Sequence, residues 1–109
     1  MRVLVDVDGI LCEKAEIGNP SSMLTAKPIA ENIKAVNRLY KLGHKVIIYT
    51  ARRGTDCDDP VALDQETATL RWLVANRVMY HKVLFNKPWA DYYVDDRAIG
   101  MGELLKVGE

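Results

Sequence analysis

The sequence lacks any net charge and any long apolar run. Fifteen Lys and Arg residues balance fifteen Asp and Glu residues, so the formal net charge is zero and no global field attracts nucleic acid or an anionic membrane. The longest apolar stretches, such as 46–49 and 83–85, fall far short of the ~20 residues that a membrane span needs. The first residues pass directly into a strand-like run, so we expect no secretory signal. We therefore expect a cytoplasmic protein without a membrane partner, and nucleic acid is disfavoured as a partner.

Cysteine is scarce as well, and the two cysteines have no metal-site spacing. Cys12 and Cys57 belong to no CxxC pair, and no histidine pattern accompanies them, which argues against zinc. We expect free thiols. A disulfide between them is the alternative, because both are expected on loops at the same edge of the fold.

The length is that of one domain. Of 109 residues, 49% are apolar, enough for one hydrophobic core but not for a second catalytic domain. No internal repeat and no low-complexity segment divides the chain. We expect a single domain over residues 1–109.

Apolar patterns alternate along the chain between strand and helix. A short, β-branched run from Arg2 up to the Asp6–Asp8 region predicts a buried strand that stops at Gly9. Residues 10–27 are rich in Gly, Asn, Pro and Ser and predict mainly loop. Apolar residues then recur at helical spacing from Ile29 to Tyr40, and Gly43 is placed to end this helix.

The second half repeats the alternation. We expect a buried strand over 44–50, a loop over 51–60, a helix over 61–76, and short strands over 82–85 and 92–94. This order is typical of an α/β protein with a parallel sheet. We predict a three-layer, Rossmann-like architecture with helices on both faces of the sheet.

Reactive side chains follow the expected strands, at the edge where parallel sheets bind ligands. They are Asp6, Asp8, Thr50, Lys87, Asp95 and Asp96. Carboxylates brought so close repel one another unless a cation neutralises them, and hard oxygen donors favour Mg²⁺. A carboxylate nucleophile, a neighbouring acid and cations over the phosphoryl oxygens are what phosphoryl transfer needs.

The same residues form four motifs in a recognisable order. The sequence Asp6-Val7-Asp8-Gly9 follows an apolar run, Thr50 ends the next one, Lys87 comes third, and Asp95-Asp96 follows an aromatic strand. The pattern resembles the four motifs of the haloacid dehalogenase superfamily over almost the whole chain. The sequences Thr50-Ala51-Arg52 and Asp95-Asp96-Arg97-Ala98 resemble small capless members associated with capsule or polysaccharide biosynthesis, and also polynucleotide phosphatase domains.

The resemblance implies a Mg²⁺-dependent phosphomonoester hydrolase. Asp6 is then the nucleophile that forms an aspartyl-phosphate, and Asp8 is the general acid and base. The implied metal ligands are Asp6, the Asp8 backbone carbonyl, Asp95 and, through water, Asp96. The implied contacts to the substrate phosphate come from Thr50, Ala51, Arg52 and Lys87.

The chain is too short between its motifs for a cap domain. An open site either admits large substrates or borrows a cover from a second copy, and we expect a homo-oligomer. A small phosphorylated metabolite such as a sugar phosphate is the expected substrate. The alternatives are a polynucleotide 3′-phosphatase and a phospho-accepting, receiver-like signalling domain, although a receiver carries its acceptor aspartate after a middle strand, where this chain has Thr50.

Overall fold

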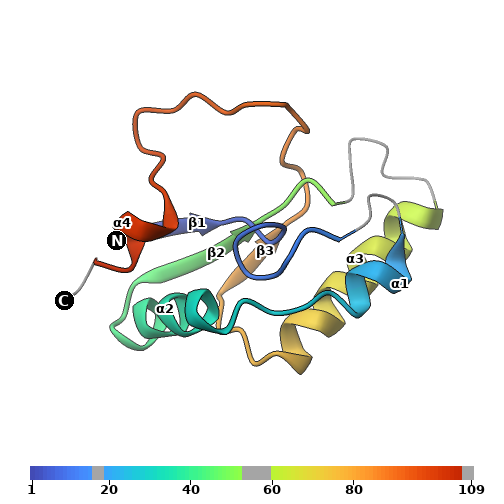
Figure 1. Ribbon diagram of the computed structural model, residues 1–109, viewed down its shortest axis with the longest axis horizontal. Coiled ribbons are helices and arrows are strands. Elements are labelled where there is room, and N and C mark those ends of the chain that lie inside the picture. The colour runs from blue at the N-terminus through green and yellow to red at the C-terminus, as the bar shows by residue number, and fades with distance from the viewer. Residues whose placement is uncertain (16–18, 53–59, 107–109) are drawn as a thin grey trace.

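The protein is described by a computed structural model that covers residues 1–15, 19–52 and 60–106. Cys57 and the acidic residues around it lie outside the described part, so the expectation for this thiol is not addressed. The elements are β1 (Arg2–Val5), α1 (Pro20–Leu24), α2 (Ala30–Lys41), β2 (Lys45–Tyr49), α3 (Pro60–Ala75), β3 (Lys82–Leu84) and α4 (Met101–Leu104), labelled in Figure 1.

The three strands form one parallel sheet in the order β1-β2-β3. Val5 pairs with Ile48 and Ile48 with Val83, so the three strands end at the same edge. The predicted α/β class and parallel sheet are confirmed.

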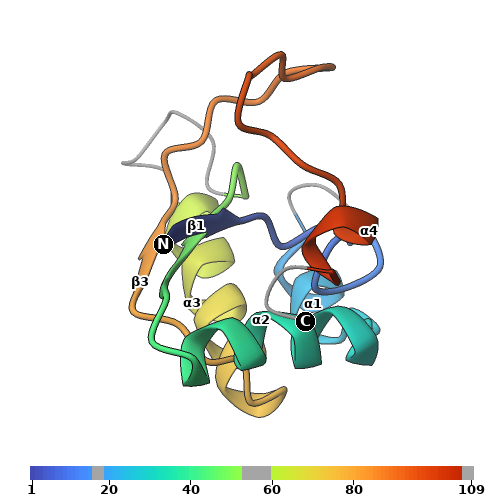
Figure 2. The same ribbon diagram turned by 90° about the vertical axis from the view of Figure 1, so that its left-hand side faces the viewer.

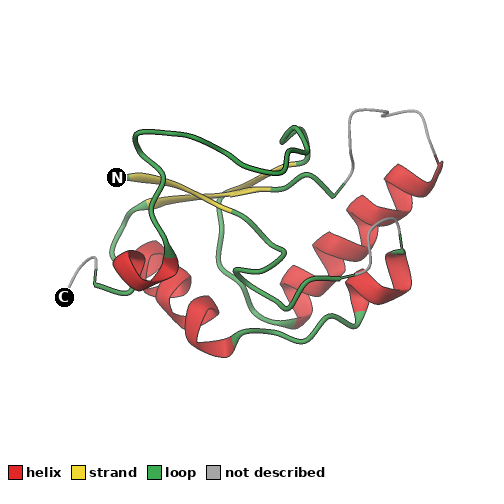
Figure 3. Ribbon diagram, turned by 45° about the horizontal axis from the view of Figure 1, so that its top comes forward, coloured by secondary structure: helices red, strands yellow, loops and turns green. Residues whose placement is uncertain are grey.

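The helices gather on one side of the sheet, as Figures 1 and 2 show for α1, α2 and α3. The two connections β1-α2-β2 and β2-α3-β3 step across the sheet in the same direction, and crossovers of one hand then place their helices on the same face. Segment 86–100 runs over the other side as a loop, drawn in green in Figure 3. A helical layer on this second face is not seen among the described residues.

The core lies between the sheet and α2 and α3. Its largest fully buried side chain is Trp72 of α3, which belongs to one apolar cluster with residues of the strands and of α2. The predicted stripe of α2 is confirmed by buried Ile33 and Val36. Gly43 follows α2 with φ +93°, a conformation that glycine adopts without strain, and it ends the helix as expected.

One prediction about local structure is incomplete and one is wrong. The segment 10–27 contains the helix α1, which begins where the Asn19 side chain accepts a hydrogen bond from the Ser22 N–H at 3.1 Å. The strand expected over 92–94 is loop. Tyr92 and Val94 are 88% and 100% exposed, so these two side chains bury almost no apolar surface that would hold the segment against the sheet.

The described helices were also tested for membrane insertion. In residues 1–15, 19–52 and 60–106, no helix has both the length and the apolar character to cross a membrane.

Candidate active site

The shared edge of the three strands brings together residues from three distant parts of the sequence. Asp6 follows β1 directly, and Thr50 follows β2. The Thr50 N–H donates to the Leu84 carbonyl at 3.0 Å, and the Lys87 N–H donates to the Thr50 carbonyl at 3.3 Å. These backbone bonds extend the pairing past β3 and place Lys87 beside the end of β2, from where its side chain reaches Asp6 at the end of β1.

Asp6 and Lys87 form an ion pair at this edge. One carboxylate oxygen of Asp6, Oδ1, accepts from the Val7 N–H at 2.8 Å, while Oδ2 lies 3.5 Å from Lys87 Nζ. The Asp6 side chain is 35% exposed, so solvent and small solutes reach it. Lys87 is held from the other side by the ring of Tyr93, whose centroid lies 4.3 Å from Nζ.

A tight turn after β1 sets the direction of Asp8. The Val7 carbonyl accepts from three successive backbone N–H groups, those of residues 10–12, and the Gly9 N–H donates to the Cys12 carbonyl at 2.8 Å. Gly9 has φ +81°, which glycine tolerates and other residues rarely adopt. The glycine of the first motif is therefore required by the turn that carries the two aspartates.

Two nitrogens of Arg52 donate hydrogen bonds to the Asp8 carboxylate. Nε donates to Oδ2 at 3.0 Å and Nη2 donates to Oδ1 at 2.8 Å. The Arg52 side chain is only 1% exposed, whereas the Asp8 side chain is 30% exposed. Such a fork is the strongest geometry for an arginine–carboxylate pair, and its burial limits screening by water.

Arg52 has partners other than Asp8 as well. Nη1 donates to the hydroxyl of Thr69 on α3 at 3.1 Å, and Nη2 also lies 3.4 Å from Cys12 Sγ. The Thr69 hydroxyl in turn donates to the Gln65 carbonyl at 2.8 Å. Arg52 was expected to contact substrate phosphate; in the structure its guanidinium is buried against Asp8 instead.

Cys12 is a buried free thiol, as expected. Burial raises the pKa of Cys12 to about 11, outweighing the opposite effect of the Arg52 cation nearby. The thiol therefore stays protonated at neutral pH and is not a nucleophile.

Thr50 and Ala51 sit in the loop that leads from β2 to Arg52. Thr50 is fully buried, and its hydroxyl accepts from the Arg52 N–H at 3.2 Å. Ala51 is half-buried. In this arrangement the Thr50 hydroxyl supports the backbone of Arg52 rather than facing solvent, and a substrate oxygen cannot reach it without local movement.

The proposed metal ligands are not assembled. Asp95 and Asp96 are exposed on segment 86–100, and Asp95 Oδ1 caps its own turn by accepting from the Arg97 N–H at 2.8 Å. Within the described ranges, no three side chains of His, Cys, Asp or Glu lie close enough to hold a metal ion. Asp6 is paired with Lys87 and Asp8 with Arg52, so the donor set as arranged does not fit a Mg²⁺ site.

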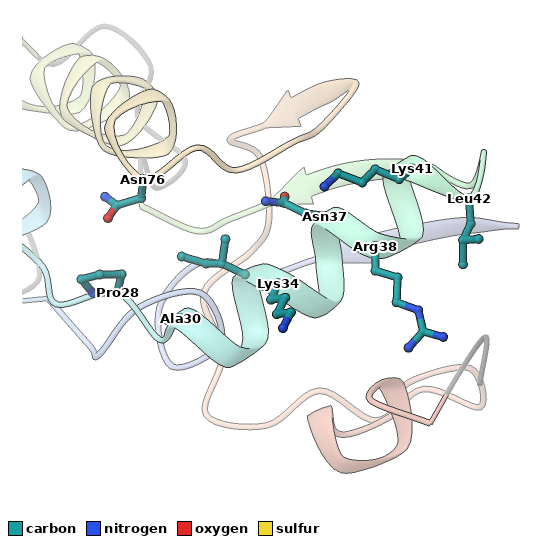
Figure 4. Close-up of a pocket in the computed structure, with 9 residues that line it drawn as sticks. Pro28, Ala30, Lys34, Asn37, Arg38, Lys41, Leu42 and Asn76 are labelled. Carbon is teal, nitrogen blue, oxygen red and sulfur yellow. The ribbon is translucent and has the colours of Figure 1, made fainter.

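The largest hollow lies away from these carboxylates, along α2. Figure 4 shows Lys34, Asn37 and Lys41 of this helix on its rim, with Pro28 and Asn76 opposite. Its volume is about 550 Å³, but no carboxylate, thiol or histidine lines it. The ionisable residues that line it are all cationic, whereas the edge of the sheet holds carboxylates beside a lysine, so the edge is the better candidate site.

Comparison with solved structures gives three related folds. A crystal structure of a target protein from Vibrio cholerae has 27% sequence identity and a TM-score of 0.77, covering 96% of this chain and 87% of that one. A chain of the Pnkp1/Rnl/Hen1 complex has 19% identity and a TM-score of 0.62, with 87% of this chain and 31% of that one covered. The D,D-heptose 1,7-bisphosphate phosphatase from B. bronchiseptica, solved with magnesium and phosphate, has 18% identity and a TM-score of 0.53, with coverage of 89% and 53%.

No protein-family model matches the chain, and no curated protein matches it. The chain spans about a third of the Pnkp1-complex chain and about half of the heptose bisphosphate phosphatase. The fold is nevertheless shared over most of this chain. The α/β fold that the resemblance to the haloacid dehalogenase superfamily implies is thus confirmed, because these solved structures share it over most of this chain.

Proposed function

We propose that this chain is a phosphomonoesterase that works through an aspartyl-phosphate on Asp6. The observation that carries the proposal is the Asp6 carboxylate, accessible at the end of β1 and 3.5 Å from the Lys87 ammonium. The neighbouring Asp8 is held in a fixed orientation. A nucleophilic carboxylate, a cation and a second carboxyl group are the parts that phosphoryl transfer requires.

In the first step Asp6 attacks phosphorus. The Val7 N–H holds Oδ1, so Oδ2 is the attacking oxygen, on the side where Lys87 faces the transferred phosphoryl group. A bond forms between Oδ2 and phosphorus while the bond from phosphorus to the leaving oxygen breaks. Asp8 gives its proton to that oxygen, so the product leaves as an alcohol.

In the second step water releases the phosphate. The Asp8 carboxylate takes a proton from water, the water oxygen bonds to phosphorus, and the acyl-phosphate bond to Asp6 breaks. Asp6 is restored as a carboxylate, inorganic phosphate departs, and Asp8 regains its proton.

In the proposed first step, the proton that Asp8 donates is carried by Oδ2. Oδ1 accepts from Arg52 and from the Ala15 N–H at 3.3 Å, with the Cys12 thiol 3.8 Å away. Among the described residues only Arg52 donates to Oδ2. A carboxylate oxygen has two lone pairs, so Oδ2 keeps one for the proton.

Magnesium dependence enters the proposal from the motif resemblance and from the magnesium bound to the heptose bisphosphate phosphatase of the same fold. The arrangement of donors described above does not fit the ion, and no step is assigned to it. For Asp95 and Asp96 to bind a metal beside Asp6, segment 86–100 has to fold back toward β1. Asp95→Asn and Asp96→Asn are expected to raise the Mg²⁺ concentration needed for half-maximal activity, and an unchanged requirement would remove them as ligands.

The proposed substrate is a small phosphorylated metabolite such as a sugar phosphate. Zero net charge gives a polyanion no general attraction, so a nucleic acid end is the less favoured substrate. A cytoplasmic location and a homo-oligomer that covers the open site remain part of the proposal, and light scattering tests the oligomer.

The test is phosphate release from phosphorylated sugars, nucleotides and oligonucleotide ends, with and without Mg²⁺. Asp6→Asn keeps the size of the side chain but removes the nucleophile, and it is expected to abolish turnover. Asp64→Asn, an exposed site on α3, is the matched control and should leave turnover unchanged. Full activity of Asp6→Asn would exclude the mechanism. Labelling by acetyl phosphate without turnover would favour the receiver-like alternative.

A further inference from the structure

The Asp8 carboxylate is oriented through a buried chain of hydrogen bonds that reaches α3. Its members are the Arg52 guanidinium, the Thr69 hydroxyl and the Gln65 carbonyl, linked at 3.1 and 2.8 Å. Arg52 is 5% exposed and Thr69 is fully buried. Water therefore cannot replace a partner that is removed, and each link depends on the next.

The order of these hydrogen bonds, from Thr69 through Arg52 to Asp8, indicates their role. Arg52 bonds to Asp8 with Nε and Nη2, so Nη1 is the third guanidinium nitrogen and is left for another partner. Nη1 donates to the Thr69 hydroxyl, and this hydrogen bond fixes the rotation of the guanidinium plane. Since both Asp8 oxygens are bound to this plane, its rotation also sets where Oδ2 points.

Thr69 belongs to a different part of the chain from the four motifs. It lies 17 residues beyond Arg52, and its hydroxyl is anchored to α3 by the Gln65 carbonyl four residues before it. A threonine that bonded only to its own helix would satisfy its hydroxyl equally well and could face any direction. Here the oxygen also accepts from Arg52, which ties the helix to the site.

We propose that Thr69 is a positioning residue for the proton transfer by Asp8, acting through Arg52. The inference rests on the proposed phosphatase function. General acid catalysis is effective only when the acid lies within hydrogen-bond reach of the leaving oxygen, and small misplacements are costly. Loss of the Thr69 hydroxyl lets the guanidinium turn and moves Asp8 Oδ2 off that position.

The leaving group separates this role from a general loss of structure. An alkyl phosphate needs a proton on its departing oxygen, whereas p-nitrophenyl phosphate releases a stable phenolate without one. Thr69→Val keeps the shape and removes the hydroxyl. We expect its kcat/KM to fall about tenfold for an alkyl phosphate and to change little for p-nitrophenyl phosphate. Thr69→Ser keeps a hydroxyl at this position and should show the wild-type ratio of the kcat/KM values for the two substrates.

Each outcome is informative. A fall by the same factor for both substrates, or no fall for either, overturns the positioning role. Wild-type protein that hydrolyses neither substrate overturns the proposed function itself. Should Thr69→Val not fold, as judged by circular dichroism, Arg52→Lys takes its place, because lysine lacks the planar fork that spans both Asp8 oxygens and reaches Thr69. The same selective loss is then expected, and an unchanged substrate ratio contradicts the inference.

Discussion

Replacing Arg52 by Met tests whether this arginine is a structural partner of Asp8 or a free residue at the rim. Met keeps much of the apolar stem but removes the guanidinium, with its fork on Asp8 and its bond to Thr69. Breaking a buried ion pair on one side costs about 3–5 kcal/mol. Because the Asp8 side chain is 30% exposed, water solvates it in part, and we expect a loss of about 2–3 kcal/mol in the free energy of unfolding.

Urea unfolding followed by circular dichroism measures this loss without any substrate. With an m-value of about 1–1.5 kcal/mol per molar urea, the midpoint should fall by about 2 M. Arg71→Met is the matched control, since Arg71 is exposed on α3 and its replacement should change stability by less than about 0.5 kcal/mol. A double-mutant cycle with Asp8→Asn should give a coupling energy above about 1 kcal/mol. If Arg52→Met is as stable as its control, the ion pair does not have the role described.

Three further predictions concern other contacts. Lys87→Met should lower kcat/KM by about 10²-fold, because it removes the cation 3.5 Å from Asp6, and Lys87→Arg should recover part of it. In a Cys57→Ser background, Cys12 of the folded protein should resist iodoacetamide at pH 8, because its pKa of about 11 keeps it protonated. It should react once urea unfolds the chain. Fast labelling of the folded protein would refute this. Asn37→Leu should cost about 1–3 kcal/mol in thermal or urea unfolding, because Asn37 bonds to two backbone groups of the turn after α3 at 2.9 and 2.7 Å; an unchanged stability would contradict it.

Apolar periodicity was enough to predict most of the sheet and its crossover helices. The stripe in α2 and the β-branched run of β2 reflect burial of one helix face and of the central strand, and burial is encoded locally. β1 was expected to be buried as well, but it is an edge strand on which Leu4 is 51% exposed. α1 was missed because its turn-forming residues outweighed its helical signal. The pair Asn19-Pro20 could have revealed it, since Asn caps helices well and Pro suits the first turn.

The strand expected over 92–94 was wrong because the local sequence does not determine whether a segment finds a strand to pair with. Its residues favour extended structure, but a strand exists only when a neighbour pairs with it, and this segment has no such partner among the described residues. Asp95 and Asp96 were expected at the end of that strand; they lie on the exposed loop instead, and their role as metal ligands stays a prediction.

The site was predictable where it depends on strand ends, and not where it depends on packing. Asp6 and Lys87 meet because parallel strands end at one edge, which the order of the motifs already indicates. The contact of Arg52 with Thr69 joins a loop to the middle of a helix. Nothing in the local pattern distinguishes Thr69 from an ordinary buried helix residue until the fold brings the two together.

The central claim is that Asp6 carries the phosphoryl group. Rapid acid quenching of the protein during turnover of a phosphomonoester, followed by borohydride reduction of the acyl-phosphate and peptide mass spectrometry, locates the modified residue. We expect modification at Asp6 and its loss in Asp6→Asn, with Asp64→Asn labelled like the wild type. A phosphoryl group found on another residue, or turnover with no covalent intermediate on Asp6, would contradict it.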